Sequence, residues 1–172
     1  FVKSVDDLPP FTDYTMAGRT YRYMEKEPLY PFGYGLSYTT FAYSNLRIPA
    51  AAETGDEVEV QVEVTNIGPR AGHEVVQLYV RALEASAKTP IHSLQGFAKV
   101  YLEPGERAVV KFSLTPRQLA VFYDDGSCAV EPGRYALFVG GSAPDTRSIA
   151  LCGSAPLCGE LQLRGRRLPL PF

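Results

Sequence analysis

From about residue 41 onward, apolar and polar residues alternate along the chain with a period of two. The clearest example is residues 57–66, where valines fill every second position and mostly glutamates lie between them. Residues 106–115 alternate in the same way. A period of two indicates a β-strand that packs one face on a core and turns the other face to water.

Shorter segments continue this pattern. We expect further strands at residues 73–82, 96–102, 134–141 and 147–151, a last edge strand at 159–165, and a helical turn within 116–124. Two Glu-Pro-Gly stretches supply turn chemistry, because proline presets φ and glycine accepts a positive φ. About seven short strands separated by turns predict an all-β fold, an antiparallel β-sandwich.

The N-terminal part has a different composition. Residues 11–43 contain ten of the twenty aromatic residues of the chain and show no lasting period, although residues 18–24 suggest one short strand. The run EPLYPFGYGLSYTTFAYS, residues 27–44, places six aromatic side chains among two prolines and two glycines. Proline and glycine favour an extended, bent path here. We call residues 27–40 the aromatic strap.

Two interpretations of the strap remain open. A monomer rarely exposes a large apolar patch without a partner, which favours packing against a neighbouring domain or against the sandwich itself. Aromatic faces also stack on sugar rings, so contact with a carbohydrate is the alternative. The candidate residues for either role are Tyr30, Phe32, Tyr34 and Tyr38.

Charge and hydropathy narrow the range of partners. The net charge is −2 and there is no basic stripe, which argues against nucleic acid. No apolar run approaches the roughly 20 residues that span a bilayer, so no membrane partner is expected. The chain begins with Phe1, and its first residues lack the pattern of a signal peptide. We therefore expect a piece of a longer protein.

The three cysteines do not form the framework of a disulfide-rich domain. Cys128, Cys152 and Cys158 are most simply free thiols, which slightly favours the cytoplasm. A bond between Cys152 and Cys158 would close a small loop and stays an alternative. His73 and His92 have no ligand spacing with a cysteine, so neither a metal nor a cofactor is expected.

No constellation of catalytic residues stands out. Cleavage of a glycoside takes two carboxyl groups facing one cleft, about 5 to 10 Å apart. Asp124 and Asp125 are adjacent and precede a glycine, which is typical of a turn. The glutamates of residues 57–63 line a solvated strand face. We therefore expect no catalytic residue in this chain.

Several long stretches resemble one family of enzymes. Residues 18–44 are similar to the segment of glycoside hydrolase family 3 enzymes, β-glucosidases and β-xylosidases, that leaves their α/β-sandwich domain. The likeness continues in VTNIGPRAGHEVVQLYV, LQGFAKVYLEPGERAVVKFSL and VEPGRYALFVGGSAPD. In that family these stretches form a C-terminal, immunoglobulin-like domain of the fibronectin type III-like class.

This resemblance implies a division of the chain and a role for it. Residues 1–40 would be the tail of a preceding α/β domain plus the interdomain strap, 41–152 the β-sandwich, and 153–172 an edge strand and tail. The family's catalytic aspartate and acid/base residue lie on domains that precede the matched part. The implied function is therefore a non-catalytic accessory domain that braces the catalytic domains of a β-glycosidase and helps to position substrate.

Other functions stay open beside this one. A module that binds oligosaccharide or polysaccharide, or one that binds protein, would also suit a sandwich with exposed aromatic residues. The isolated chain is also expected to self-associate through its apolar N-terminal segment.

Overall fold

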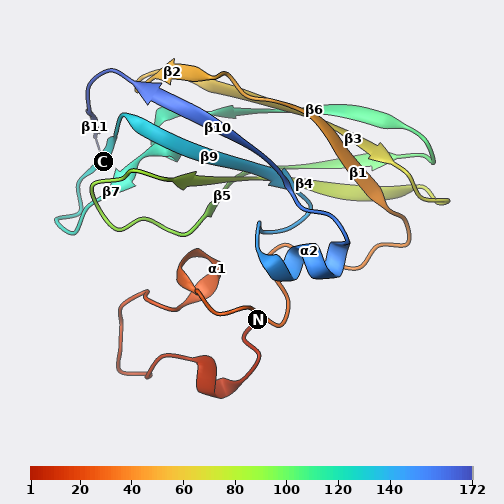
Figure 1. Cartoon of the computed structure of the whole chain (residues 1–172), viewed down its shortest axis with the longest axis horizontal. Coiled ribbons are helices and arrows are strands. Elements are labelled where there is room, and N and C mark those ends of the chain that lie inside the picture. The colour runs from red at the N-terminus through yellow and green to blue at the C-terminus, as the bar shows by residue number, and fades with distance from the viewer. Residues whose placement is uncertain (172) are drawn as a thin grey trace.

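The computed structural model describes residues 1–171 and confirms the all-β sandwich (Figure 1). One sheet has the strand order β1-β3-β6, with bounds Phe41–Arg47, Val58–Asn66 and Arg107–Leu114. The other has the order β2-β10-β9-β4-β5, with bounds Ala51–Glu53, Leu157–Arg164, Gly133–Gly140, Gly72–Ala82 and Ser93–Leu102. A small sheet, β11-β8-β7, joins Leu168–Leu170, Cys128–Val130 and Val121–Phe122.

The core lies between the two larger sheets. From residue 58 to 64, every second residue of β3 is a valine with at most 1% of its surface exposed, and β6 pairs with β3 antiparallel so that Val62 lies opposite Val110. Leu78, Leu137 and Leu161 of the five-stranded sheet are fully buried against this face. Full burial of such a side chain stabilises a fold by about 1.5–3 kcal/mol.

Within residues 1–171, four short helical segments accompany the strands. They are η1 (Val5–Asp7), α1 (Thr20–Tyr23), η2 (Pro116–Leu119) and α2 (Thr146–Cys152). The segment η2 confirms the helical turn expected within residues 116–124. Among residues 1–171, no helix is both long enough and apolar enough to cross a membrane.

The strand expected at residues 147–151 is wrong, because this segment forms α2. The side chain of Asp145 accepts a hydrogen bond from the backbone N–H of Ser148 at 2.6 Å and caps the first turn. Gly153 ends the helix with a φ of 75°. Aspartate before a helix and glycine after it are the usual helix boundaries, and these signals outweigh the apolar pair Ile149 and Leu151.

Two further expectations need correction. Residues 18–24 contain the short helix α1 and not a strand, since the backbone N–H of Met24 bonds the carbonyl of Thr20. The segment at 159–165 is not an edge strand either. It belongs to β10, which pairs with β9 along its length and with β2 in parallel on its other side. The residues of β2 carry no strong strand pattern, so the sequence did not indicate that β10 would have a second neighbour.

Asn66 joins three parts of the fold at the end of β3. It is fully buried, and its side-chain amide donates to the carbonyl oxygens of Arg70 at 2.7 Å and Leu102 at 2.9 Å. Its side-chain oxygen accepts from Thr39 Oγ1 at 2.7 Å and from the backbone N–H of Gly68 at 3.1 Å. The end of the strap, the turn after β3 and the end of β5 therefore share one polar side chain.

We predict that Asn66→Ala lowers the free energy of unfolding by about 2–4 kcal/mol, because it leaves buried donors and acceptors unpaired. Denaturant unfolding monitored by circular dichroism measures this loss. Asn45→Gly is the control, since Asn45 is exposed and has a φ of 53° that glycine adopts freely. Equal stability of the two variants would contradict the role given to Asn66.

Candidate functional site

The aromatic strap crosses the outer face of the five-stranded sheet. Figure 1 shows the N-terminal segment on the same side of this sheet as α2. Backbone carbonyls along the strap accept hydrogen bonds from the sandwich. Gly33 O accepts from Gln77 Nε2 at 3.4 Å, Phe32 O from the N–H of Ala143 at 2.8 Å, and Leu29 O from Arg147 Nε at 3.2 Å. The strap thus packs against the sandwich itself, as one of the two packing interpretations expects.

Gln77 on β4 holds the centre of the strap. Its side-chain N–H₂ also donates to Gly141 O at 2.6 Å, and its oxygen accepts from Tyr79 OH at 2.5 Å. Gly33 lies directly over it with a φ of 79°, and a Cβ at this position would overlap the Gln77 amide. Only glycine meets both conditions without strain.

A cluster of rings lies beside this contact. The rings of Tyr21 and Phe32 stack with centroids 4.2 Å apart, and Tyr21 meets the fully buried Tyr79 edge-on at 6.1 Å. The hydroxyl of Tyr21 accepts a hydrogen bond from the N–H of Leu94 at 3.1 Å. Aromatic pairs of this geometry contribute about 0.5–1.5 kcal/mol beyond the area they bury. The cluster therefore links α1, the strap and β4.

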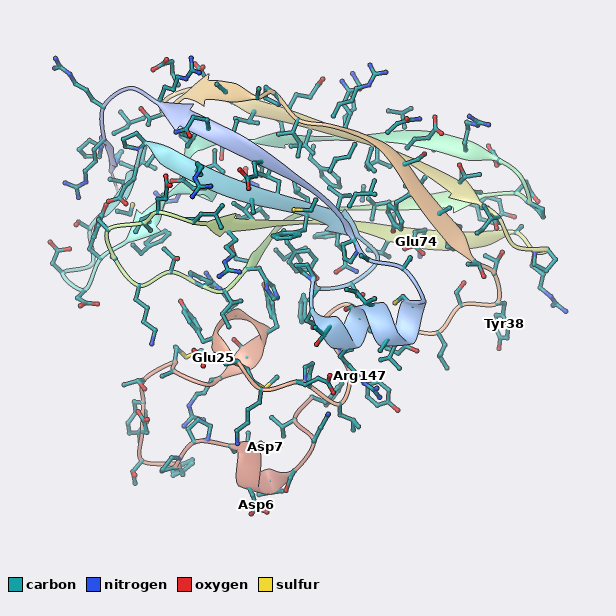
Figure 2. All side chains as sticks on the ribbon, viewed as in Figure 1. Asp6, Asp7, Glu25, Tyr38, Glu74 and Arg147 are labelled. Atoms are coloured by element: carbon teal, nitrogen blue, oxygen red, sulfur yellow. The ribbon has the colours of Figure 1, made fainter. Side chains whose placement is uncertain are left out.

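The structure brings together three of the four residues named from the sequence. Tyr30 and Tyr34 stack with centroids 5.9 Å apart, and Phe32 belongs to the ring cluster beside them. Tyr38 lies apart, 92% exposed, on the connection that rises to β1 (Figure 2). Tyr21 was missed, because residues 18–24 were expected to form a strand. Gln77 was also missed, since it occurs within an ordinary strand pattern.

A cleft of about 1240 Å³ is lined by residues of the strap, α2 and the outer sheet face. Its lining is mainly aromatic and aliphatic and includes a few charged side chains. Figure 2 shows Arg147 on α2 pointing toward the N-terminal segment, with Glu25 near α1. Arg81 of β4 and Asp145 also line the cleft. A concave apolar surface with a few charged groups is suited to binding, either of a ligand or of another protein segment.

His92 lies in the wall of this cleft, with 7% of its surface exposed. Its ring packs against Tyr21 and Tyr79, each with centroids 5.7 Å away. Among residues 1–171, its Nε2 atom has no hydrogen-bond partner. Burial lowers the pKa of His92 and nearby Arg81 lowers it further, while Asp145 acts in the opposite direction. Folding therefore favours the neutral form of the imidazole relative to the unfolded chain.

One of the two turn aspartates considered for chemistry has structural partners. Asp125 accepts hydrogen bonds from the N–H of Ser127 at 2.9 Å and from its hydroxyl at 2.7 Å, as in an ordinary turn. Cys128, Cys152 and Cys158 are free thiols in the structure. Within residues 1–171, no three histidine, cysteine, aspartate or glutamate side chains are grouped as ligands for a metal ion.

Comparison with known proteins identifies the sandwich. The family model described as fibronectin type III-like domain matches residues 74–143. The chain contains a fibronectin type III-like domain. A xylan 1,4-β-xylosidase from Xylanibacter ruminicola is 40% identical over 147 residues, which cover 84% of this chain and 17% of that protein. A periplasmic β-glucosidase from Salmonella typhimurium is 37% identical over 153 residues, covering 81% and 20%.

Solved structures agree with this assignment. A β-glucosidase from Listeria innocua in complex with glucose superposes with a TM-score of 0.71 at 32% identity, covering 88% of this chain and 20% of that one. The resemblance to the fibronectin type III-like domain of glycoside hydrolase family 3 enzymes is thereby confirmed. The chain spans a fifth or less of the length of the relatives described here.

We predict that Gly33→Ala detaches the strap from the fibronectin type III-like domain, because alanine is strained at this φ and overlaps Gln77. Limited proteolysis should cleave residues 18–38 several times faster than in the parent sequence. Gly35→Ala is the matched control, because a Cβ at Gly35 meets no atom within 4 Å. Equal cleavage of the two variants would show that the Gly33 contact does not hold the strap.

We also predict a pH dependence of stability from His92. Because folding lowers its pKa, the unfolded chain binds a proton that the folded chain does not, once the pH falls below about 6.5. The free energy of unfolding should then fall with decreasing pH, by up to about 1.4 kcal/mol per pH unit. His92→Phe should remove this contribution. Identical pH profiles of the two proteins between pH 5 and 8 would contradict it.

Proposed function

We propose that this chain is a non-catalytic accessory domain of a longer β-glycosidase, and that it braces the catalytic part of that enzyme. The observation that carries the proposal is the unequal attachment of the N-terminal segment. The strap is fixed to the sandwich at Phe32 and Gly33, as described above. Residues 1–19 are instead held mainly by contacts with their own segment, such as Lys26 Nζ to Asp7 Oδ1 at 2.8 Å.

The side chains of this N-terminal segment support the same proposal. Phe1, Phe11 and Tyr14 each have 88–89% of their surface exposed, and Val5 has 80%. Large apolar side chains are seldom left this exposed in a domain that is complete by itself. We propose that residues 1–26 are the tail of a preceding domain and that the strap connects this domain to the sandwich. In this proposal, the strap leaves the sheet in a fixed direction and so holds the sandwich in a fixed orientation relative to the preceding domain.

The activity of the longer protein is part of the proposal. The relatives are described as β-xylosidases and β-glucosidases, and the chain matches only a small share of each. Glycoside cleavage takes two carboxyl groups facing one cleft. We propose that both come from the catalytic part of the longer protein, which also decides the sugar. The isolated chain is expected to hydrolyse neither p-nitrophenyl β-glucoside nor β-xyloside.

A carbohydrate-binding role is the second candidate. It is favoured by the stacked pair Tyr30 and Tyr34, since Tyr30 lines the cleft and is 45% exposed. Tyrosine faces exposed in this way can stack on a sugar ring. This candidate is tested by binding of the chain to insoluble xylan or glucan. Retention of the chain that is lost in Tyr30→Ala would support a carbohydrate-binding role in addition to bracing.

The bracing role is tested in the longer polypeptide that contains this chain. Gly33→Ala should shorten the half-life of glycosidase activity at elevated temperature, because it releases the strap that fixes the domains to each other. The KM should stay unchanged, since the variant does not alter the catalytic part. Gly35→Ala is again the control. Equal half-lives of the two variants would rule out bracing through the strap, and clear turnover by the isolated chain would rule out a non-catalytic domain.

A further inference from the structure

The outer face of β4 and β5 carries a second set of exposed apolar side chains. The register places His73 opposite Tyr101, Val75 opposite Lys99, and Gln77 opposite Phe97. Because side chains in one strand alternate between faces, these six residues share the solvent side of the sheet. Phe97 is 71% exposed, Tyr101 52% and Val75 40%. A phenylalanine this exposed in a ten-residue edge strand has no role in the core of the sandwich.

This β4–β5 face is continuous with the surface that the strap already covers. Gln77 belongs to both, because it pairs with Phe97 across the strands and donates to Gly33 O. Val75 lines a groove together with Leu36 of the strap, which is 93% exposed. The strap thus covers the part of the outer sheet face at Gln77, and the exposed side chains Val75 and Phe97 lie beside it.

The chemistry of the β4–β5 face favours a protein surface over a polysaccharide. A sugar platform needs hydrogen-bonding groups beside its rings, whereas Phe97 and Val75 offer none. The hydroxyl of Tyr101 already donates to Glu103 Oε1 at 3.0 Å, and its ring packs edge-on against His73 with centroids 5.0 Å apart. Apolar and aromatic side chains with few charges are typical of the buried centre of a protein interface.

The likeness to longer proteins indicates which protein covers this face. The relatives described above are at least five times as long as the segment that matches this chain. A domain in such a protein has neighbours in the same chain, and linked neighbours meet at a high effective concentration. For binding to this face, a neighbouring domain of the same polypeptide is therefore favoured over a second copy of the chain.

We propose that the β4–β5 face, centred on Phe97 and Tyr101, is a docking surface for the catalytic part of the longer polypeptide. This inference rests on the proposed function and extends it, because it adds a second contact that is independent of the strap. Two contacts on one sheet face, one through the strap and one through β5, would fix the rotation of the domain as well as its distance. A single strap would leave that rotation free.

Chemical labelling of lysines tests the proposal without any mutation. Lys99 lies at the centre of the face, opposite Val75, whereas Lys111 of β6 points outward from the other sheet with 58% of its side chain exposed. Acetylation with an N-hydroxysuccinimide ester, read by peptide mass spectrometry, gives the rate at each lysine. We expect the rate at Lys99 to be at least about fivefold lower in the longer polypeptide than in the isolated chain, because interface centres exclude water. The rate at Lys111 should change little.

A pair of variants provides the second measurement. Phe97→Ser with Tyr101→Ser should restore labelling of Lys99 in the longer polypeptide and lower its temperature of inactivation. Val109→Ser is the matched control, because Val109 is 59% exposed on β6 in the other sheet. Each substitution removes exposed apolar surface without opening the core, so the isolated chain should keep its stability.

Each outcome has a defined meaning. Equal labelling of Lys99 in the two proteins would overturn the docking surface while leaving the strap as a brace. If no longer polypeptide contains this chain, the proposed function itself fails. Protection of Lys99 in the isolated chain that grows with protein concentration would assign the face to a second copy. Retention on insoluble glucan, lost in the double variant, would assign the face to a polysaccharide and overturn the proposal.

Discussion

The side chain of Gln77 connects the parts of this protein that its proposed role needs. It stands on the outer face of a strand whose inner face belongs to the core, and it bonds the strap, the loop before α2 and Tyr79. A buried amide with all its bonds made is rigid, and removing one partner leaves a costly unpaired group. The strap therefore has one position on the sheet, set by Gln77 below it and by the absence of a side chain on Gly33 above.

Many of the exposed apolar residues lie on the side of the sandwich where the strap lies, although Val109 of β6 is exposed on the other sheet. The strap lies against the outer surface of the five-stranded sheet, and the β4–β5 face is part of that same surface. The outer face of β3 and β6 differs, because it carries charged residues such as Glu59, Glu63 and Lys111. One outer face suits water and the other suits a neighbour. This asymmetry is what an accessory domain within a larger enzyme would need.

Two glutamates show how the fold uses its carboxyl groups. Burial raises the pKa of Glu74 on β4, and the hydrogen bond from Tyr43, at 2.5 Å, does not fully offset it. Burial also tends to raise the pKa of Glu131. Hydrogen bonds from Ser86 and Tyr123 outweigh this effect, so the pKa of Glu131 is lowered. Both carboxyl groups join separate segments. Glu74 joins β4 to β1, and Glu131, directly after β8, joins the loop at Ser86 to the segment at Tyr123. Their perturbed pKa values are explained by structure without any catalytic role.

The sequence by itself determined the sandwich, because alternating valines at 58–64 can be buried on one face only in a strand. It also indicated the strap, through aromatic residues between prolines and glycines. Tertiary structure decided the rest. The helix at 146–152 depends on the Asp145 cap, and β10 became an inner strand only because β2 could pair beside it. The cleft, the Gln77 contact and the β4–β5 face join residues far apart in sequence, and a local pattern carries no information about which outer faces will meet.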